Sequence, residues 1–232
     1  LPEEETIHTA FIGLGRYGHG IGRALSKNWT GVNPITFHQI HRKIAPDTLK
    51  SLLQGKELVF LACDQLDEAW SVARRAALEV EPFLLITLHP PQIPHQNTLQ
   101  SNESILQAPL VYSFPTAWDP VSSIFGSLVN TGLIGVDLAD LRSVVGGKSG
   151  KIDVLQTDYI SFDEDLENWT RHMPGHDLTK RFLILEQSCS HGIELVHKLA
   201  DKVGNKSPEI YYSAVSSGIS SEEVQVTMLQ AD

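Results

Sequence analysis

Residues 132–144 read GLIGVDLADLRSV, and this stretch carries the most specific local pattern in the 232-residue chain. Its opening is bounded by glycines, and its two acids, Asp137 and Asp140, are three residues apart. The pattern predicts a helix over Asp137–Val145, which ends where Gly146 begins a glycine pair. Acids at a helix start are favoured by the helix dipole by roughly 0.3 to 1 kcal/mol, so both acids also have a purely structural explanation.

A second glycine loop lies near the N-terminus. Residues 13–18 read GLGRYG, directly after the apolar run His8–Leu14 and before a helical pattern over Gly18–Ser26. Between a strand and a helix, such a loop can bring backbone N–H groups and a helix N-terminus to a phosphate. The candidate phosphate-binding residues are Gly13, Gly15, Arg16 and Gly18. The alternative is a tight turn that packs helix against strand and binds no ligand.

The N-terminal half alternates between strand and helix patterns. Strands are predicted at Pro34–His38, Glu57–Cys63 and Phe83–Leu88, and helices at Pro46–Gln54 and from a cap at Asp67 through Glu79. Alternation of this kind predicts a doubly wound parallel sheet with right-handed crossovers. The pattern then breaks, and a long surface loop is expected from His89 to Gln107, with a further strand at Leu110–Phe114.

The C-terminal half predicts a second α/β lobe. After a helix at Val121–Asn130, the pattern indicates a flexible turn, four strands, an acidic loop and one more helix. These elements are the turn Lys148–Lys151, strands at Ile152–Tyr159, Arg181–Glu186, Glu209–Val215 and Val224–Leu229, the loop to Asp177, and the helix Ser190–Val203. The predicted fold class is α/β: a Rossmann-like doubly wound parallel sheet over residues 1–118, joined by a helix and loop over 119–135 to a second, smaller α/β domain with a mixed sheet over 136–232.

Composition excludes several functions. The formal net charge of −10 argues against a nucleic-acid backbone binder, and no apolar run approaches the ~20 residues of a membrane helix. The two cysteines are far apart, and the histidine pairs His38/His41 and His172/His176 have no carboxylate or cysteine spaced to complete a site, so no metal site is predicted. An acidic N-terminus unlike a secretory signal leads us to expect a cytoplasmic protein. The acidic segment Asp158–Glu167 is interpreted as a solvated loop, or alternatively as a contact for a basic protein partner.

The stretch 132–144 resembles the signature of the FtsZ family of bacterial tubulins, in which a loop reading G-L-I-N-V-D-F-A-D-V-R leads into the first helix of the second domain. The residues around Phe182–Glu186, Pro208–Ala214 and Glu222–Thr227 resemble the family's late strands in the same order. The glycine loop and the run ELVFLAC fall where the family has its first phosphate loop and the strand before its second. The resemblance covers most of the chain and implies an FtsZ/tubulin-like fold.

The resemblance also implies roles for the two acids of this stretch. In the family, the acids that Asp137 and Asp140 match reach the nucleotide of a neighbouring subunit and help to activate water. They are therefore the catalytic candidates, acting on a neighbouring subunit. Gly135 replaces the signature asparagine, and no residue matches the asparagine that contacts the guanine base.

The second phosphate loop departs from the family. The family has a glycine and threonine run, G-G-G-T-G-T-G, whereas residues 63–68 read CDQLDE. Three acids at this position would repel a triphosphate, at about 1 to 4 kcal/mol for each charge pair ~4 Å apart. We therefore expect either no nucleotide cofactor or GTP and GDP bound weakly, with little or no GTPase activity.

Three functional hypotheses follow. The first is an FtsZ/tubulin-like protein with a degenerate GTP site that associates with itself or with an FtsZ-like relative, in a cytoskeletal, cell-division or membrane-remodelling role. The second is an active GTP-hydrolysing filament protein with a rearranged phosphate loop. The third is an NADP-dependent oxidoreductase built on the glycine loop, with Arg42 and Lys43 near the cofactor's 2′-phosphate.

Overall fold

The computed structural model describes residues 7–28, 35–40, 44–91, 98–109, 119–129, 132–173, 180–187, 193–204, 209–216 and 222–231. The chain forms two compact units. The first comprises Leu1–Ser122 and Gly146–Gly150, and the second comprises Ser123–Val145 and Lys151–Asp232. The predicted strand at Leu110–Phe114 lies outside the described residues.

The first unit is built on a parallel sheet with strand order β2-β1-β3-β4-β5. Its strands are β1 (Thr9–Leu14), β2 (Ile35–Ile40), β3 (Leu58–Ala62), β4 (Leu84–His89) and β5 (Glu103–Gln107). The residues of β1, β3 and β4 are buried throughout, as near-continuous apolar runs in a parallel sheet require. The predicted doubly wound arrangement is confirmed.

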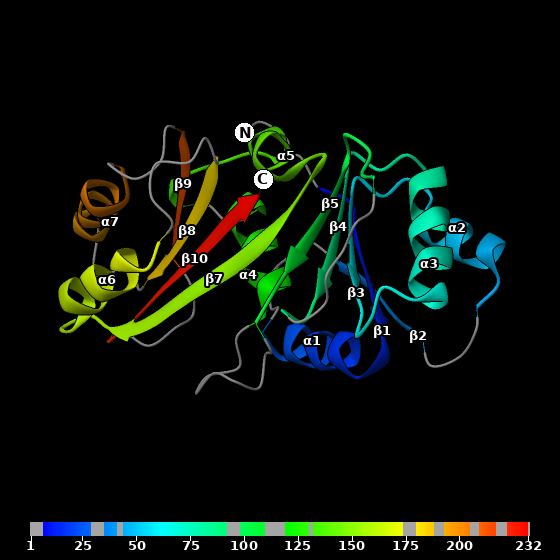
Figure 1. Cartoon of the computed structure of the whole chain (residues 1–232), viewed down its shortest axis with the longest axis horizontal. Helices are drawn as coiled ribbons and strands as arrows, with labels where there is room; N and C mark the ends of the chain where they lie inside the picture. The colour runs from blue at the N-terminus through cyan, green and yellow to red at the C-terminus, as the bar shows by residue number, and fades with distance from the viewer. Residues whose placement is uncertain are drawn as a thin grey trace, which may run out of the picture. The chain divides into compact units, whose positions relative to one another are not determined.

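Helices cover both faces of this sheet (Figure 1). Helices α2 (Pro46–Leu53) and α3 (Glu68–Glu79) lie on one face, where they pack against alternate residues of β1 such as Ile12. Helix α1 (Gly15–Asn28) lies on the other face, where the ring of Phe11 approaches Gly22. Side chains of successive strand residues point to opposite faces, so β1 contributes to both layers.

Strand β5 corrects the long loop expected between His89 and Gln107. The carboxylate of Glu103, the first residue of β5, is fully buried and receives two hydrogen bonds from the guanidinium of Arg74 on α3. The Arg74 Nη2 to Glu103 Oε2 distance is 2.6 Å. A charged residue thus occupies a buried strand position because its counter-ion arrives from a neighbouring helix, and the sequence pattern carries no sign of that pairing.

The second unit contains a mixed sheet with strand order β7-β10-β8-β9-β6. Its strands are β6 (Gly132–Ile134), β7 (Lys148–Asp158), β8 (Arg181–Gln187), β9 (Ile210–Ser216) and β10 (Glu223–Ala231). The β10/β8 and β6/β9 pairs are antiparallel, whereas β8 and β9 are parallel. The predicted mixed sheet is confirmed, but the flexible turn expected at Lys148–Lys151 is wrong because β7 already begins at Lys148.

Helices again lie on both faces of the second sheet. Helices α6 (Phe162–Arg171) and α7 (Glu194–Gly204) pack together over a core that contains alternate residues of β10. On the opposite face lies α4 (Pro120–Val129), whose Ser123 hydroxyl donates to the Glu186 carboxylate of β8 at 2.7 Å. Helix α5 (Leu138–Val145) contacts β10 and β8.

Helix α6 corrects the acidic loop expected after residue 159. Phe162 and Leu166, four residues apart, are fully buried and anchor one face of the helix. Its acids are partly neutralised by α7, because Lys198 pairs with Asp163 at 3.0 Å and Lys202 with Glu167 at 3.3 Å. Because charged residues are so frequent in this segment, the sequence pattern does not indicate the amphipathic helix, whose apolar positions are few and well spaced.

Candidate functional site

The glycine loop over residues 13–18 is required by close packing. A Cβ atom on Gly13 would lie 2.8 Å from the carbonyl oxygen of Gly18, and one on Gly18 would lie 2.4 Å from that of Ala62. Both distances are shorter than real Cβ atoms allow, so the start of α1 can approach β1 and β3 only without side chains there. Gly15 adopts a φ of +67°, which glycine tolerates at no steric cost.

The amide groups at the start of α1 are already bonded to a carboxylate of the same chain. The Arg16 N–H donates to Oδ2 of Asp64 at 2.7 Å, and the Tyr17 N–H donates to Oδ1 of the same group. A Cβ on Gly15 would lie 2.3 Å from Asp64 Oδ2, so the carboxylate fits closely against the glycine loop. Asp64 thus takes the position at the helix N-terminus where a bound phosphate would accept these hydrogen bonds.

Helix α3 has a second acidic cap at the same edge of the sheet. The Trp70 N–H donates to Oδ1 of Asp67 at 3.0 Å, which confirms the predicted N-cap. Asp64 and Asp67 follow β3, and the glycine loop follows its parallel neighbour β1, so the carboxyl ends of the two strands bring them together. The N-termini of α1 and α3 are therefore both closed by carboxylates.

The four predicted phosphate-binding residues gather at one end of α1, but their contributions differ. Gly13 and Gly18 permit the helix to approach the strands, and Gly15 makes the turn. Arg16 contributes its backbone N–H to Asp64, while its side chain is exposed. Sequence reasoning placed acids near this loop but missed that Asp64 binds it. The available signal was an acid directly after a strand that neighbours the glycine-loop strand.

The Cys63 thiol lies beneath these acids and is not a nucleophile. It is 1% exposed. Burial raises the pKa of Cys63 to about 12, with the nearby carboxylates of Asp67 and Asp64 adding to the shift. A thiol of that pKa stays protonated at neutral pH, and only the thiolate is reactive.

The two acids of the 132–144 stretch form a reciprocal helix cap. The Asp140 N–H donates to Oδ1 of Asp137 at 2.8 Å, and the Asp137 N–H donates to Oδ2 of Asp140 at 3.1 Å. This is the arrangement of a capping box at the start of α5. Each carboxylate keeps a second oxygen that accepts neither of these bonds. The cap explains both acids structurally and leaves their catalytic role a prediction.

Comparison with known proteins finds this architecture among solved structures but no match by sequence. No protein-family model matches the chain, and no curated protein matches it by sequence. Among solved structures, a mutant FtsZ from M. jannaschii superimposes with a TM-score of 0.76 at 12% identity, covering 98% of this chain and 91% of that one. The fold is that of the FtsZ/tubulin superfamily. The resemblance seen in the sequence is thereby confirmed at the level of the fold.

Two archaeal CetZ structures are further FtsZ/tubulin-type matches. CetZ1 from Haloferax volcanii, a GDP-bound monomer, has a TM-score of 0.59 at 10% identity and covers 96% of this chain and 93% of that one. CetZ2 from the same organism, a GTPγS-bound protofilament, has a TM-score of 0.55 at 11% identity, with coverage of 97% and 93%. At such identities the likeness concerns the arrangement of elements, so the chemistry of this chain has to be argued from its own residues.

GTP, the nucleotide that the fold implies, does not fit the residues at the glycine loop. The amides of Arg16 and Tyr17 are engaged by Asp64, and a phosphate would have to displace a carboxylate of the same charge sign. The amide of Trp70 at the start of α3 is engaged in the same way by Asp67. These three N–H groups cannot bind phosphate while the two carboxylates stay in place.

Proposed function

We propose that the chain is a cytoskeletal protein of the FtsZ/tubulin type with a degenerate GTP site, and that it acts by associating with itself or with a filament-forming relative. The observation that carries the degenerate site is the Asp64 carboxylate on the amides of Arg16 and Tyr17. The observation that supports assembly is the fold, which includes a protofilament-forming protein among its solved relatives.

Electrostatics opposes a nucleotide at this edge of the sheet. A phosphate bound at the start of α1 would lie close to the Asp64 carboxylate, which bonds the same amides, at a cost of about 1 to 4 kcal/mol for a charge pair ~4 Å apart. It would also have to break two charge-assisted hydrogen bonds, which are among the stronger ones in proteins. A helix dipole that would favour a phosphate is already compensated by Asp64.

The test is a calorimetric titration of the 232-residue chain with GTP and Mg²⁺. We expect the wild type to bind with a Kd above about 1 mM. The variant Asp64→Ala frees two amides and removes one charge, so it should bind GTP at least about tenfold more tightly. Asp163→Ala, on α6 of the second unit, also removes one carboxylate and serves as the matched control, which should leave GTP affinity unchanged.

Two results would contradict the proposed role of Asp64 in excluding GTP. One is a wild-type Kd for GTP well below about 1 mM. The other is Asp64→Ala, folded as judged by circular dichroism, with no gain in affinity for GTP or inorganic pyrophosphate. The second result would mean that Asp64 is only a helix cap and that other features exclude the nucleotide.

A second candidate, an active GTPase, is favoured by the retention of Asp137 and Asp140 at the start of α5. It predicts turnover that rises with protein concentration and disappears in Asp137→Ala, since the acids would act on a neighbour's nucleotide. The NADP hypothesis is opposed by the same Asp64 carboxylate, because the glycine loop would have to hold a pyrophosphate. Adding NADPH to the titration distinguishes it from the other two.

A further inference from the structure

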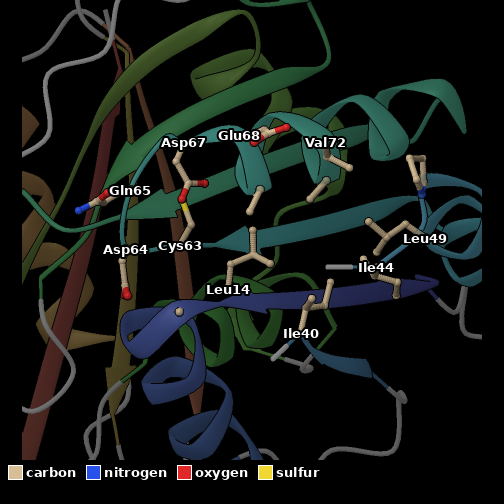
Figure 2. Close-up of a pocket in the computed structure, with 14 residues that line it drawn as sticks. Leu14, Ile40, Ile44, Leu49, Cys63, Asp64, Gln65, Asp67, Glu68 and Val72 are labelled. Carbon is tan, nitrogen blue, oxygen red and sulfur yellow. The ribbon is translucent and has the colours of Figure 1, made fainter. Parts of the chain in front are cut away.

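A cavity opens between helices α2 and α3, on the face of the first sheet opposite α1 (Figure 2). Its volume is about 620 Å³, within the range of small-molecule sites. Figure 2 shows its body as apolar. The side chains that form it come from β1, β2, α2 and α3 and the segment before α2: Leu14, Ile40, Ile44, Leu49 and Val72.

Carboxylates gather at one end of this cavity. The loop from β3 into α3 contributes Asp64, Asp67 and Glu68 to the lining. The first two are hydrogen-bonded to helix amides, whereas Glu68 is exposed and forms no ion pair with any residue that the structure describes. The described lining contains no Lys, Arg or His. Arg42 and Lys43, which are close in sequence to Ile40, lie outside the described residues.

We propose that this cavity binds a small amphipathic cation, an apolar body that carries one ammonium group. The apolar side chains remove the body from water, at about 25 cal/mol for each Å² of apolar surface buried. The ammonium group would lie at the acidic end, near Glu68 and the two caps. An anion of the same shape would meet three carboxylates there, and a neutral molecule would gain the apolar contacts alone.

This site shares Gly15, Asp64 and Asp67 with the proposed GTP site, but it differs from that site in its apolar body and in the charge that it favours. The cavity is formed by residues of the first unit alone, and its apolar body lies between α2 and α3, whereas the glycine-loop amides belong to α1 on the other face. A cation also has the charge that the carboxylates favour, while a nucleotide has the charge that they oppose. The cation proposal can therefore fail while the degenerate-site proposal stands, and the reverse also holds.

The experiment compares three probes with one apolar body: 4-phenylbutylamine, 4-phenylbutanol and 4-phenylbutyrate. Each is titrated into the 232-residue chain, and binding is followed by calorimetry and by amide shifts in NMR spectra. The expected order of affinity is amine, then alcohol, then acid. The amine's advantage over the alcohol should shrink as salt is added, because the acidic end is open to solvent.

Three variants locate the site. Glu68→Gln should weaken the amine about two- to fivefold and leave the alcohol unchanged, as expected for loss of one exposed charge. Val72→Phe should weaken all three probes by filling the apolar body, and Ala69→Trp, at an exposed lining position, tests the same point if Val72→Phe misfolds. Glu164→Gln, an exposed acid on α6, is the matched control and should change nothing.

Clear results would overturn the proposal. Saturable binding of the acid as tight as that of the amine would show that the acidic end does not set the charge preference. Binding of the amine that is unaffected by Ala69→Trp and by folded Val72→Phe would place the probe elsewhere on the acidic surface. Absence of saturation by the amine at millimolar concentration would exclude the site.

Discussion

Asp64 shows how a side chain can accept the hydrogen bonds that the N-terminus of a helix offers. A carboxylate and a phosphate both present oxygen acceptors with negative charge, so the N-terminus of a helix accommodates either one. Because the carboxylate is covalently part of the chain, it loses no translational entropy when it binds the amides, whereas a free phosphate would. The amides of Arg16 and Tyr17 are therefore satisfied in the absence of nucleotide.

The buried thiol of Cys63 gives a prediction at the same scale. Its pKa of about 12, against an ordinary value of 9.0, leaves roughly one thiol in ten thousand ionised at pH 8, compared with about one in ten for an ordinary thiol. In a Cys189→Ser background, alkylation of native protein by iodoacetamide at pH 8 should be at least about a hundredfold slower than in urea. Mass spectrometry of the labelled peptide measures both rates.

The pH dependence of this thiol has a definite sign. Because the folded-state pKa is raised, the neutral thiol's contribution to stability is fully present below pH 9 and is lost as the pH rises toward 12. Between pH 9 and pH 11, the free energy of unfolding should therefore decrease less in Cys63→Ala than in the Cys189→Ser parent. Equal losses in the two proteins would contradict the raised pKa.

At the residue scale, the sequence predicted types of contact better than their partners. Asp67 was recognisable as an N-cap because a cap bonds to an amide three residues away. Asp64 and Arg16 are 48 residues apart, so their hydrogen bond depends on which strands are neighbours and on the path of the loop after β3. A local sequence pattern shows neither the strand order nor the path of a loop. The acid and the glycine loop were both identified, but their hydrogen bond was not.

Helix α1 shows at the scale of elements how backbone contact determines packing. Gly18 faces the carbonyl oxygen of Ala62, whereas Gly20, half a turn further, has no atom within 4 Å of the position its Cβ would take. The two glycines thus have different reasons to be present. Gly18 permits close approach between helix and strand, while Gly20 carries only the entropic cost of glycine in a helix.

A matched pair of substitutions tests this difference. Gly18→Ala should lower the free energy of unfolding by about 1 to 3 kcal/mol, because the helix must move away from a backbone oxygen. Gly20→Ala should raise it by roughly 0.5 to 1 kcal/mol through helix propensity. Urea unfolding followed by circular dichroism measures both. If Gly18→Ala were stabilised as well, a side chain would fit at position 18. The close approach of α1 to the carbonyl oxygen of Ala62 in β3 would then be contradicted.

Elements with a strong apolar pattern could be predicted from the sequence, whereas α6 and β5, which contain ion-paired acids, could not. Strands β1, β3 and β4 are buried apolar runs, and the sequence placed each within a residue or two of its observed bounds. Helix α6 was taken for a loop because its few buried residues lie among charges, and strand β5 because it is short, follows a polar stretch and begins with a charged residue, Glu103. The ion pairs that join α6 to α7 and β5 to α3 become visible only in the folded chain.

At the scale of the whole molecule, a short signature decided the fold more effectively than overall similarity. No family model and no curated protein matches the sequence, yet the FtsZ structure superimposes over 98% of this chain. The reason is that a fold constrains the order of apolar and glycine positions, which many sequences satisfy, while site chemistry depends on a few side chains. Asp64 and Asp67 bond the N-termini of α1 and α3 within strands and helices that still follow the arrangement of the fold.

The last prediction concerns assembly through the acids at the start of α5. Because Asp137 and Asp140 cap each other's backbone, alanine variants would disturb the helix as well as the charge. The variant Asp137→Asn with Asp140→Asn keeps oxygen acceptors for the cap and removes both charges. If these acids contact a neighbour's nucleotide or its metal, the variant should lose co-sedimentation with an FtsZ-type protein from the same source, and wild-type co-sedimentation should weaken with salt. Co-sedimentation unchanged in the variant, with the chain alone monomeric at high concentration, would leave the pair as a helix cap.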